Sequence, residues 1–124
     1  MSKKVCLIAG VGPGTGMECA NRFSRGGYQV AMLARDKKRL NSLEKEIEDS
    51  HGYECDVSDL DQLVATLKQV AKDLGNPTIL IHNAVAGNID GGGASRFMES
   101  DPARLERNFR VNTTSLLYMA RELA

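Results

Sequence analysis

A glycine-rich turn near the start of the chain has the residue types and the spacing to hold a phosphate group. Glycines stand at every second position from Gly10 to Gly16, directly after the apolar run at residues 5–9. Because glycine lacks a Cβ atom, this backbone can turn sharply and approach a ligand closely. A helix that begins near Gly14 would direct free amide groups and a partial positive charge at the turn. Glycine runs also occur in plain loops, but the flanking strand and helix favour a site for a phosphate or pyrophosphate.

A basic residue after the second apolar run is the next candidate for binding. In a dinucleotide-binding fold the residue at the end of the second strand meets the adenosine ribose, and an acidic residue there suits NAD. Here Ala34 takes that place and Arg35 follows it. A guanidinium can bind a 2′-phosphate through two charge-assisted hydrogen bonds. The pattern favours NADP(H) over NAD(H), although Arg35 can also be a solvated strand-end residue. The charge of Asp36 opposes a phosphate unless helix capping turns it away.

Four strands are expected to position these residues. Short runs rich in apolar residues are typical of strands that are covered on both faces of a parallel sheet. The sequence predicts such strands at residues 5–9, 28–34, 53–57 and 78–82. Before the third strand, Ser50, His51 and Gly52 are interpreted as a turn with an exposed histidine.

The segments between the strands carry apolar residues at helical spacing. The first predicted helix covers residues 16–25 and packs through Cys19, Ala20 and Phe23. Asp36 is expected to cap the second helix, which has Leu40, Leu43 and Ile47 on its buried face and seven charged residues in solvent, namely Lys37, Lys38, Arg39, Glu44, Lys45, Glu46 and Glu48. Ser58 and Asp61 have the spacing of a capping box at the start of the third helix.

A long helix is predicted from Asp101 onward, with Pro102 at its first position. One face of this helix carries six residues at helical spacing, Leu105, Phe109, Asn112, Leu116, Ala120 and Leu123. A polar Asn112 within an apolar face is either a packing residue bonded to the backbone or a residue of a site. His82 is likewise either a hydrogen-bonded residue beside the sheet or a catalytic base. The glycine-rich segment at residues 86–95 is either a lid or a connection.

Alternating strands and helices predict one α/β domain over residues 1–124. Such alternation implies a parallel sheet with helices on both faces. The expected fold is a Rossmann-type, doubly wound sheet with strand order 3-2-1-4, incomplete at its C-terminal side. One βαβαβ half is complete, and the second half has its first strand and helix.

Composition bounds the class of protein. The 124 residues are 42% hydrophobic and 26% charged, and sixteen basic residues balance sixteen acidic ones. This composition is typical of a globular domain and indicates no nucleic-acid partner and no membrane surface. We expect no signal peptide or membrane span. The three cysteines, Cys6, Cys19 and Cys55, lack metal-binding spacing, so no metal site is expected. They are expected to be reduced, which predicts a cytoplasmic protein.

These motifs together resemble the short-chain dehydrogenase/reductase family. The family's turn T-G-x-x-x-G-x-G is similar to residues 9–16, with Ala9 in place of Thr. Its Asp-Val pair after the third strand is similar to Asp56 and Val57. Its N-N-A-G motif is similar to residues 82–85, where His82 replaces the first Asn and Val85 replaces Gly. The Asn of the family's Asn-Ser-Tyr-Lys set matches Asn112, which follows Val111 as in the family's V-N pair.

The resemblance implies an NADP(H)-dependent oxidoreductase that reduces a small carbonyl compound or oxidises an alcohol. Asn112 is then the catalytic-set residue in this chain. The implied cofactor-binding residues are Gly10, Gly12, Pro13, Gly14, Thr15, Gly16, Arg35, Asp56, Val57, Asn83 and Ala84. The resemblance also implies that the full-length protein is a homo-oligomer.

The family's catalytic Ser and Tyr-x-x-x-Lys lie beyond the helix that carries Asn112. Tyr118 is followed four residues later by Glu122, so it does not match the motif. The 124-residue chain alone is therefore expected to be inactive. Three alternatives stay open: a non-catalytic nucleotide-binding module or pseudoenzyme, a truncated product without function, and a methyltransferase that uses S-adenosylmethionine. Ala34 and Arg35 count against the last of these, because an acid commonly holds the ribose there.

Overall fold

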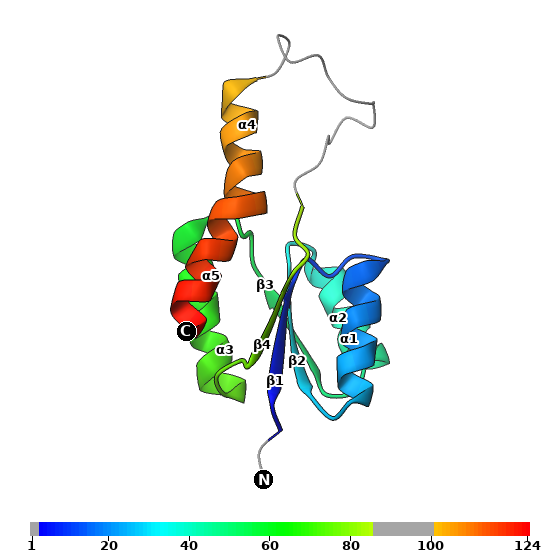
Figure 1. Ribbon diagram of the computed structural model, residues 1–124. Coiled ribbons are helices and arrows are strands. Elements are labelled where there is room, and N and C mark those ends of the chain that lie inside the picture. The colour runs from blue at the N-terminus through cyan, green and yellow to red at the C-terminus, as the bar shows by residue number, and fades with distance from the viewer. Residues whose placement is uncertain (1–2, 86–100) are drawn as a thin grey trace.

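A four-stranded parallel sheet forms the centre of the molecule (Figure 1). The computed structural model describes residues 3–85 and 101–124. The predicted glycine-rich segment at residues 86–95 lies outside the described residues. The strands are β1 (Val5–Ala9), β2 (Gln29–Ala34), β3 (Ser50–Glu54) and β4 (Ile79–His82). Their order is β3-β2-β1-β4 and every pair is parallel, which confirms the predicted α/β fold and topology.

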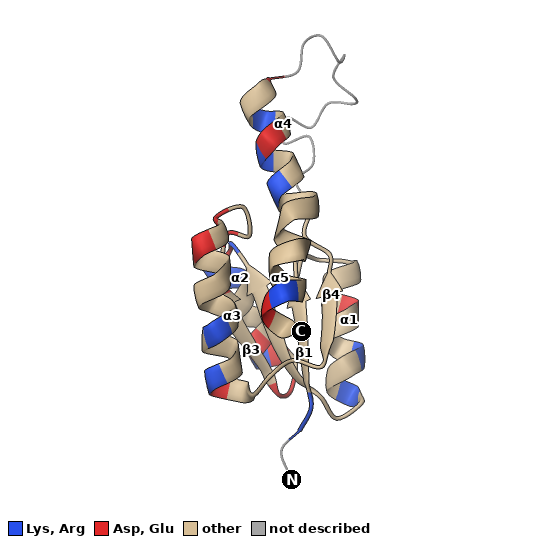
Figure 2. Ribbon diagram, turned by 60° about the vertical axis from the view of Figure 1, so that its left-hand side comes forward, with Lys and Arg blue, Asp and Glu red and all other residues tan. Residues whose placement is uncertain are grey.

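Helices cover both faces of this sheet. On one face lie α1 (Thr15–Arg25) and α2 (Lys37–Glu46), and on the other lie α3 (Leu60–Leu74) and α5 (Ser115–Leu123) (Figure 1). The last helix begins as α4 (Pro102–Phe109) and passes through a π-helical turn, Arg110–Thr114, into α5. Figure 2 shows that α4 projects past the sheet and that α3 carries charges of both signs. None of the helices among residues 3–85 and 101–124 is long and apolar enough to span a bilayer.

The core has two layers because successive residues of a strand point to opposite faces of the sheet. Along β1, Val5, Leu7 and Ala9 pack toward α3 and α5, whereas Cys6 and Ile8 pack toward α1 and α2. All five residues of this strand are buried. The apolar run therefore forms a central strand that is covered on both faces, as predicted.

The third strand lies three residues earlier than the sequence predicts. β3 runs from Ser50 to Glu54 and pairs with β2, so the predicted turn at Ser50, His51 and Gly52 is wrong. His51 is half-buried in this strand. Gly52 is needed because a Cβ atom there would lie 2.7 Å from the Cβ atom of Leu40 on α2. The sequence did not predict these bounds because this edge strand is composed mainly of polar residues.

The capping residues of the helices partly confirm the predictions. The carboxylates of Asp36 and Asp101 accept hydrogen bonds from the first turns of α2 and α4, as predicted. The predicted cap at Ser58 is wrong, because Asp59 caps α3 and accepts from the Gln62 amide at 3.1 Å. Ser58 instead donates to Asp56 through its amide and its hydroxyl.

The last helix buries a different face from the predicted apolar one. Val111, Ser115 and Met119 are buried against the rest of the domain, whereas Leu105 and Phe109 are 54% and 62% exposed. Asn112 is also exposed. A π-helical turn contains more residues than an α-helical turn. Residues spaced with the α-helical period therefore face different directions in α4 and in α5.

Candidate cofactor site

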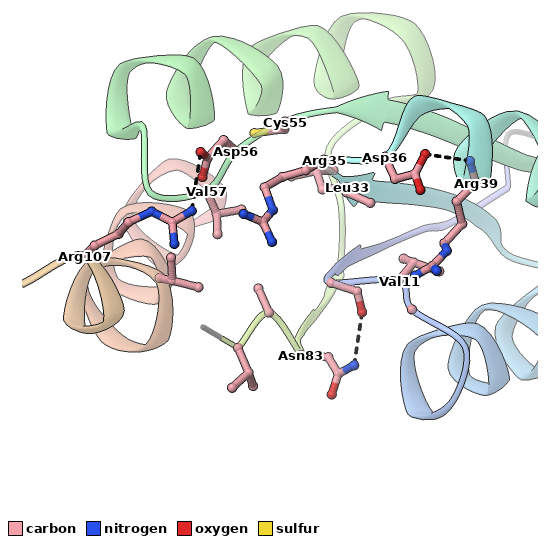
Figure 3. Close-up of a pocket in the computed structure, with 16 residues that line it drawn as sticks. Val11, Leu33, Arg35, Asp36, Arg39, Cys55, Asp56, Val57, Asn83 and Arg107 are labelled. Atoms are coloured by element: carbon pink, nitrogen blue, oxygen red, sulfur yellow. Dashed lines mark hydrogen bonds and ion pairs between the residues drawn. The ribbon is translucent and has the colours of Figure 1, made fainter. Parts of the chain in front are cut away.

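A cavity of about 410 Å³ lies at the carboxyl ends of the strands. Its walls come from the loops after β1, β2, β3 and β4 and from the last helix (Figure 3). Seven of the predicted cofactor-binding residues line it together, namely Gly10, Gly12, Arg35, Asp56, Val57, Asn83 and Ala84. In open α/β sheets ligands bind at this edge. The fold thus brings distant segments of the sequence to one site.

The glycine turn packs closely against the loop after β4. Gly10 has a φ of +92°, and a Cβ atom there would lie 2.5 Å from the Ala84 amide nitrogen. The side-chain amide of Asn83 donates to the Gly10 carbonyl oxygen at 3.0 Å. A Cβ atom at Gly16 would lie 2.2 Å from the same carbonyl oxygen. Two of the glycines are therefore required by backbone packing itself.

The start of α1 leaves its first amides without a side-chain cap. Gly14 is the N-cap residue, and its φ of +150° is a conformation that L residues rarely adopt. Pro13, Gly14 and Thr15 are exposed, and a Cβ atom at Gly14 would meet no atom within 4 Å. These residues and Gly16 do not line the cavity itself but form the turn that leads from it into α1. Uncapped amides at a helix N-terminus suit an anion.

Two arginines direct positive charge at the cavity (Figure 3). Arg35 follows β2 directly, and Arg39 lies in the first turn of α2. Arg39 Nη1 lies 3.5 Å from the position that a Cβ atom of Gly12 would take. Among residues 3–85 and 101–124, neither guanidinium forms an ion pair. The Asp36 carboxylate accepts from the Arg39 amide at 3.2 Å as the cap of α2.

An acidic group occupies the opposite wall, after β3. Oδ1 of Asp56 accepts from the Ser58 amide at 2.9 Å and from the Ser58 hydroxyl at 2.7 Å. Oδ2 of Asp56 lies 3.9 Å from Nη2 of Arg107 on α4. Partial burial opposes ionisation, but the Ser58 hydrogen bonds and the charges of Arg107 and Arg35 outweigh it and hold the pKa of Asp56 below its usual range. The carboxylate is therefore an ionised acceptor.

Asn112 lies in the π-helical turn, apart from the cavity lining. Its neighbour Val111 lines the cavity and is buried, whereas Asn112 is exposed. His82, at the end of β4, is hydrogen-bonded to Ser115, with 2.9 Å between Nε2 and Oγ. The structure thus supports the bonded interpretation of His82 and places Asn112 one residue from the cavity wall.

A model of the short chain dehydrogenase family matches residues 4–124, which is nearly the whole chain. The chain belongs to the short-chain dehydrogenase family. The bovine protein named short-chain dehydrogenase/reductase 3 is 30% identical over 118 residues, which are 91% of this chain and 37% of that protein. An uncharacterized oxidoreductase of Mycobacterium bovis is 35% identical over 88 residues, which are 65% of this chain and 26% of that protein.

Solved structures of short-chain dehydrogenases share the fold over almost every residue. A metagenomic short-chain oxidoreductase in complex with NADP superimposes with a TM-score of 0.88 at 25% identity, over 99% of this chain and 56% of that one. A short-chain type dehydrogenase/reductase from Mycobacterium marinum superimposes with a TM-score of 0.85 at 26% identity, over 98% and 49%. The chain therefore spans between about a quarter and just over half of the length of these four proteins.

Sequence reasoning missed two charged residues of the cavity. Arg39 is exposed, as predicted for the solvated face of α2, but it also lines the cavity, which the sequence did not predict. Its place in the first turn of α2, directly after the strand end that carries Arg35, is the signal that could have indicated it, although the direction of the side chain is not set by the sequence pattern. Arg107 also lines the cavity, but it comes from α4, 51 residues after Asp56, and no local pattern in the sequence links the two.

Proposed function

We propose that this chain is the cofactor-binding half of an NADP(H)-dependent oxidoreductase that interconverts a small carbonyl compound and an alcohol. The observation that carries the proposal is the pair of guanidinium groups, Arg35 and Arg39, beside the glycine turn in one cavity. A cavity with two arginines that form no ion pair within the described residues suits a phosphate ester. The metagenomic relative in complex with NADP supports the same cofactor.

The residues present fit the chemical groups of NADP(H). The amides of the glycine turn and of the first turn of α1 hold the pyrophosphate, because their donors have no side-chain acceptor there. Arg35 and Arg39 hold the 2′-phosphate. Asp56 accepts a hydrogen bond from the adenine amino group, and Val57 and Ala84 contact the rings through apolar atoms. When bound, the cofactor supplies or accepts the hydride.

We further propose that residues 1–124 form one NAD(P)-binding domain and that the family's catalytic Ser and Tyr-x-x-x-Lys follow it in the full-length protein. Asn112 belongs to the same catalytic set. An amide side chain is a poor acid, and a general acid typically contributes about 10²- to 10⁴-fold to rate. The 124-residue chain is thus expected to bind NADPH without reducing ketones or aldehydes.

The full-length protein is proposed to be a cytoplasmic homo-oligomer. The exposed apolar side chains of Leu105, Phe109 and Leu117 on the last helix support association, because large exposed apolar groups favour contact with another surface. The free cysteines Cys6 and Cys55 are buried, which suits a reducing compartment.

The cofactor assignment is tested by titrating the wild-type chain and Arg35→Ala with NADPH and with NADH. Loss of a charged hydrogen bond costs about 1.5–3 kcal/mol, or roughly 10- to 150-fold in affinity. We expect Arg35→Ala to weaken NADPH by this factor and to leave NADH unchanged. Lys38→Ala is the matched control, because Lys38 is an exposed cation on α2 that does not line the cavity. Equal affinities of the wild-type chain for NADPH and NADH would refute the assignment.

A further inference from the structure

A buried serine joins the end of β4 to the π-helical turn of the last helix. Ser115 is completely buried, and its Oγ lies 2.6 Å from the Val111 carbonyl oxygen and 2.9 Å from Nε2 of His82. Val111 lines the cofactor cavity. The three groups therefore form a chain of hydrogen bonds from the sheet edge to the cavity wall.

The direction of these hydrogen bonds follows from the chemistry of the groups. A carbonyl oxygen can only accept, so the Ser115 hydroxyl donates to Val111. The oxygen of Ser115 is then an acceptor for His82, whose Nε2 must carry a hydrogen. In its neutral form His82 is therefore the Nε2–H tautomer. Nδ1 takes no part in this chain of bonds.

The serine hydroxyl replaces a bond that the wide turn gives up. In an α-helix the Ser115 amide would donate to the carbonyl four residues earlier, that of Val111. In this structure the Ser115 amide donates to Arg110, five residues earlier, as a π-helical turn requires. The hydroxyl of Ser115 donates to Val111 instead. Such single π-turns are uncommon and frequently occur at functional sites.

We propose that His82 and Ser115 are positioning residues that hold the π-helical turn open and so fix Val111 in the cavity wall and Asn112 beside it. That this cavity binds a cofactor is taken from the proposed function, and the proposal rests on it in this respect. Without the turn, the segment from Pro102 to Leu123 would be one continuous α-helix. One residue of an α-helix corresponds to a rotation of about 100°, so α4 would turn relative to α5. Arg107 would then leave Asp56, and Val111 would leave the cavity.

The first test uses the wild-type chain and nuclear magnetic resonance of the histidine ring. Proton–nitrogen correlations at a pH where His82 is neutral report which ring nitrogen carries the hydrogen. We expect the Nε2–H tautomer to dominate. A dominant Nδ1–H tautomer would overturn the proposal, and this result does not depend on whether any variant folds.

The second test compares amide hydrogen exchange and NADPH affinity in variants of the two residues. Ser115→Ala removes the hydroxyl, and His82→Met removes the N–H donor while keeping a side chain of similar size. In both variants we expect hydrogen exchange of the amides of residues 110–115 to become about tenfold faster. The NADPH dissociation constant should rise about 2- to 10-fold. His82→Gln keeps an N–H donor and should restore both quantities. Thr113→Ala is the control, because it removes an exposed hydroxyl from the same turn.

Wild-type exchange and affinity in Ser115→Ala would overturn the positioning role. A loss that His82→Gln does not restore would also overturn it, because packing alone would then explain the effect. If the wild-type chain does not bind NADPH, the proposed function fails, and the tautomer and the exchange rates still decide whether His82 and Ser115 hold the turn.

Discussion

At the level of single residues, the charged groups of the cavity differ in whether they form ion pairs or hydrogen bonds with one another. Asp56 is held by Ser58 and faces Arg107, whereas Arg35 and Arg39 form no ion pair within the described residues. Arg35 was predicted from the sequence because its position at a strand end has a known meaning in this type of fold. The position of Arg39 depends on the direction of a long side chain in the first turn of α2. Helical periodicity alone cannot supply that direction.

The lowered pKa of Asp56 predicts a specific dependence of stability on pH. Because the folded state favours the ionised carboxylate, its contribution to stability is present above the unfolded pKa and is lost as pH falls through the folded pKa. We expect wild type to be more stable than Asp56→Asn near neutral pH, and the difference to shrink as pH falls below about 4, through the lowered pKa of the folded state. Urea unfolding across this range measures it, with the exposed Glu122→Gln as control. A difference that grows toward low pH would contradict the assignment.

At the scale of elements, local signals predicted the helices and the central strands but not every boundary. Helix α2 begins after its predicted cap, and β1 has its predicted bounds. The edge strand β3 was misplaced because its pairing with β2 and its packing against Leu40 come from distant parts of the chain. The π-helical turn was also missed, since an apolar stripe drawn with one period cannot reveal a local change of period.

Asp59, the N-cap of α3, is expected to contribute to the stability of the fold. Replacing an N-cap Asp by Ala typically costs about 0.5–2 kcal/mol, whereas Asn caps almost as well. We expect Asp59→Ala to lower the free energy of unfolding by this amount in urea denaturation, and Asp59→Asn to stay near wild type. An Asp59→Ala variant as stable as wild type would show that another residue, such as Ser58, caps the helix.

At the scale of the whole molecule, the strand order brings residues from five segments to one edge of the sheet. The alternation of strands and helices was enough to predict this topology, because parallel connections are right-handed and avoid crossing. The glycine turn and the residues after β2, β3 and β4 then had to meet at the carboxyl ends. The contribution of the last helix could not be predicted in the same way. Its approach to the cavity depends on packing between α3 and α5 and on the π-helical turn.

The proposed site distinguishes a 2′-phosphorylated adenosine from one without this phosphate, and the adenosine half of the cofactor tests this selectivity without the nicotinamide. Isothermal titration calorimetry should compare adenosine 2′,5′-bisphosphate with adenosine 5′-monophosphate on the wild-type chain. Because the two ligands differ only in the 2′-phosphate, we expect the bisphosphate to bind about 10- to 150-fold more tightly. Equal affinities, or tighter binding of the monophosphate, would contradict the proposed selectivity for the 2′-phosphate.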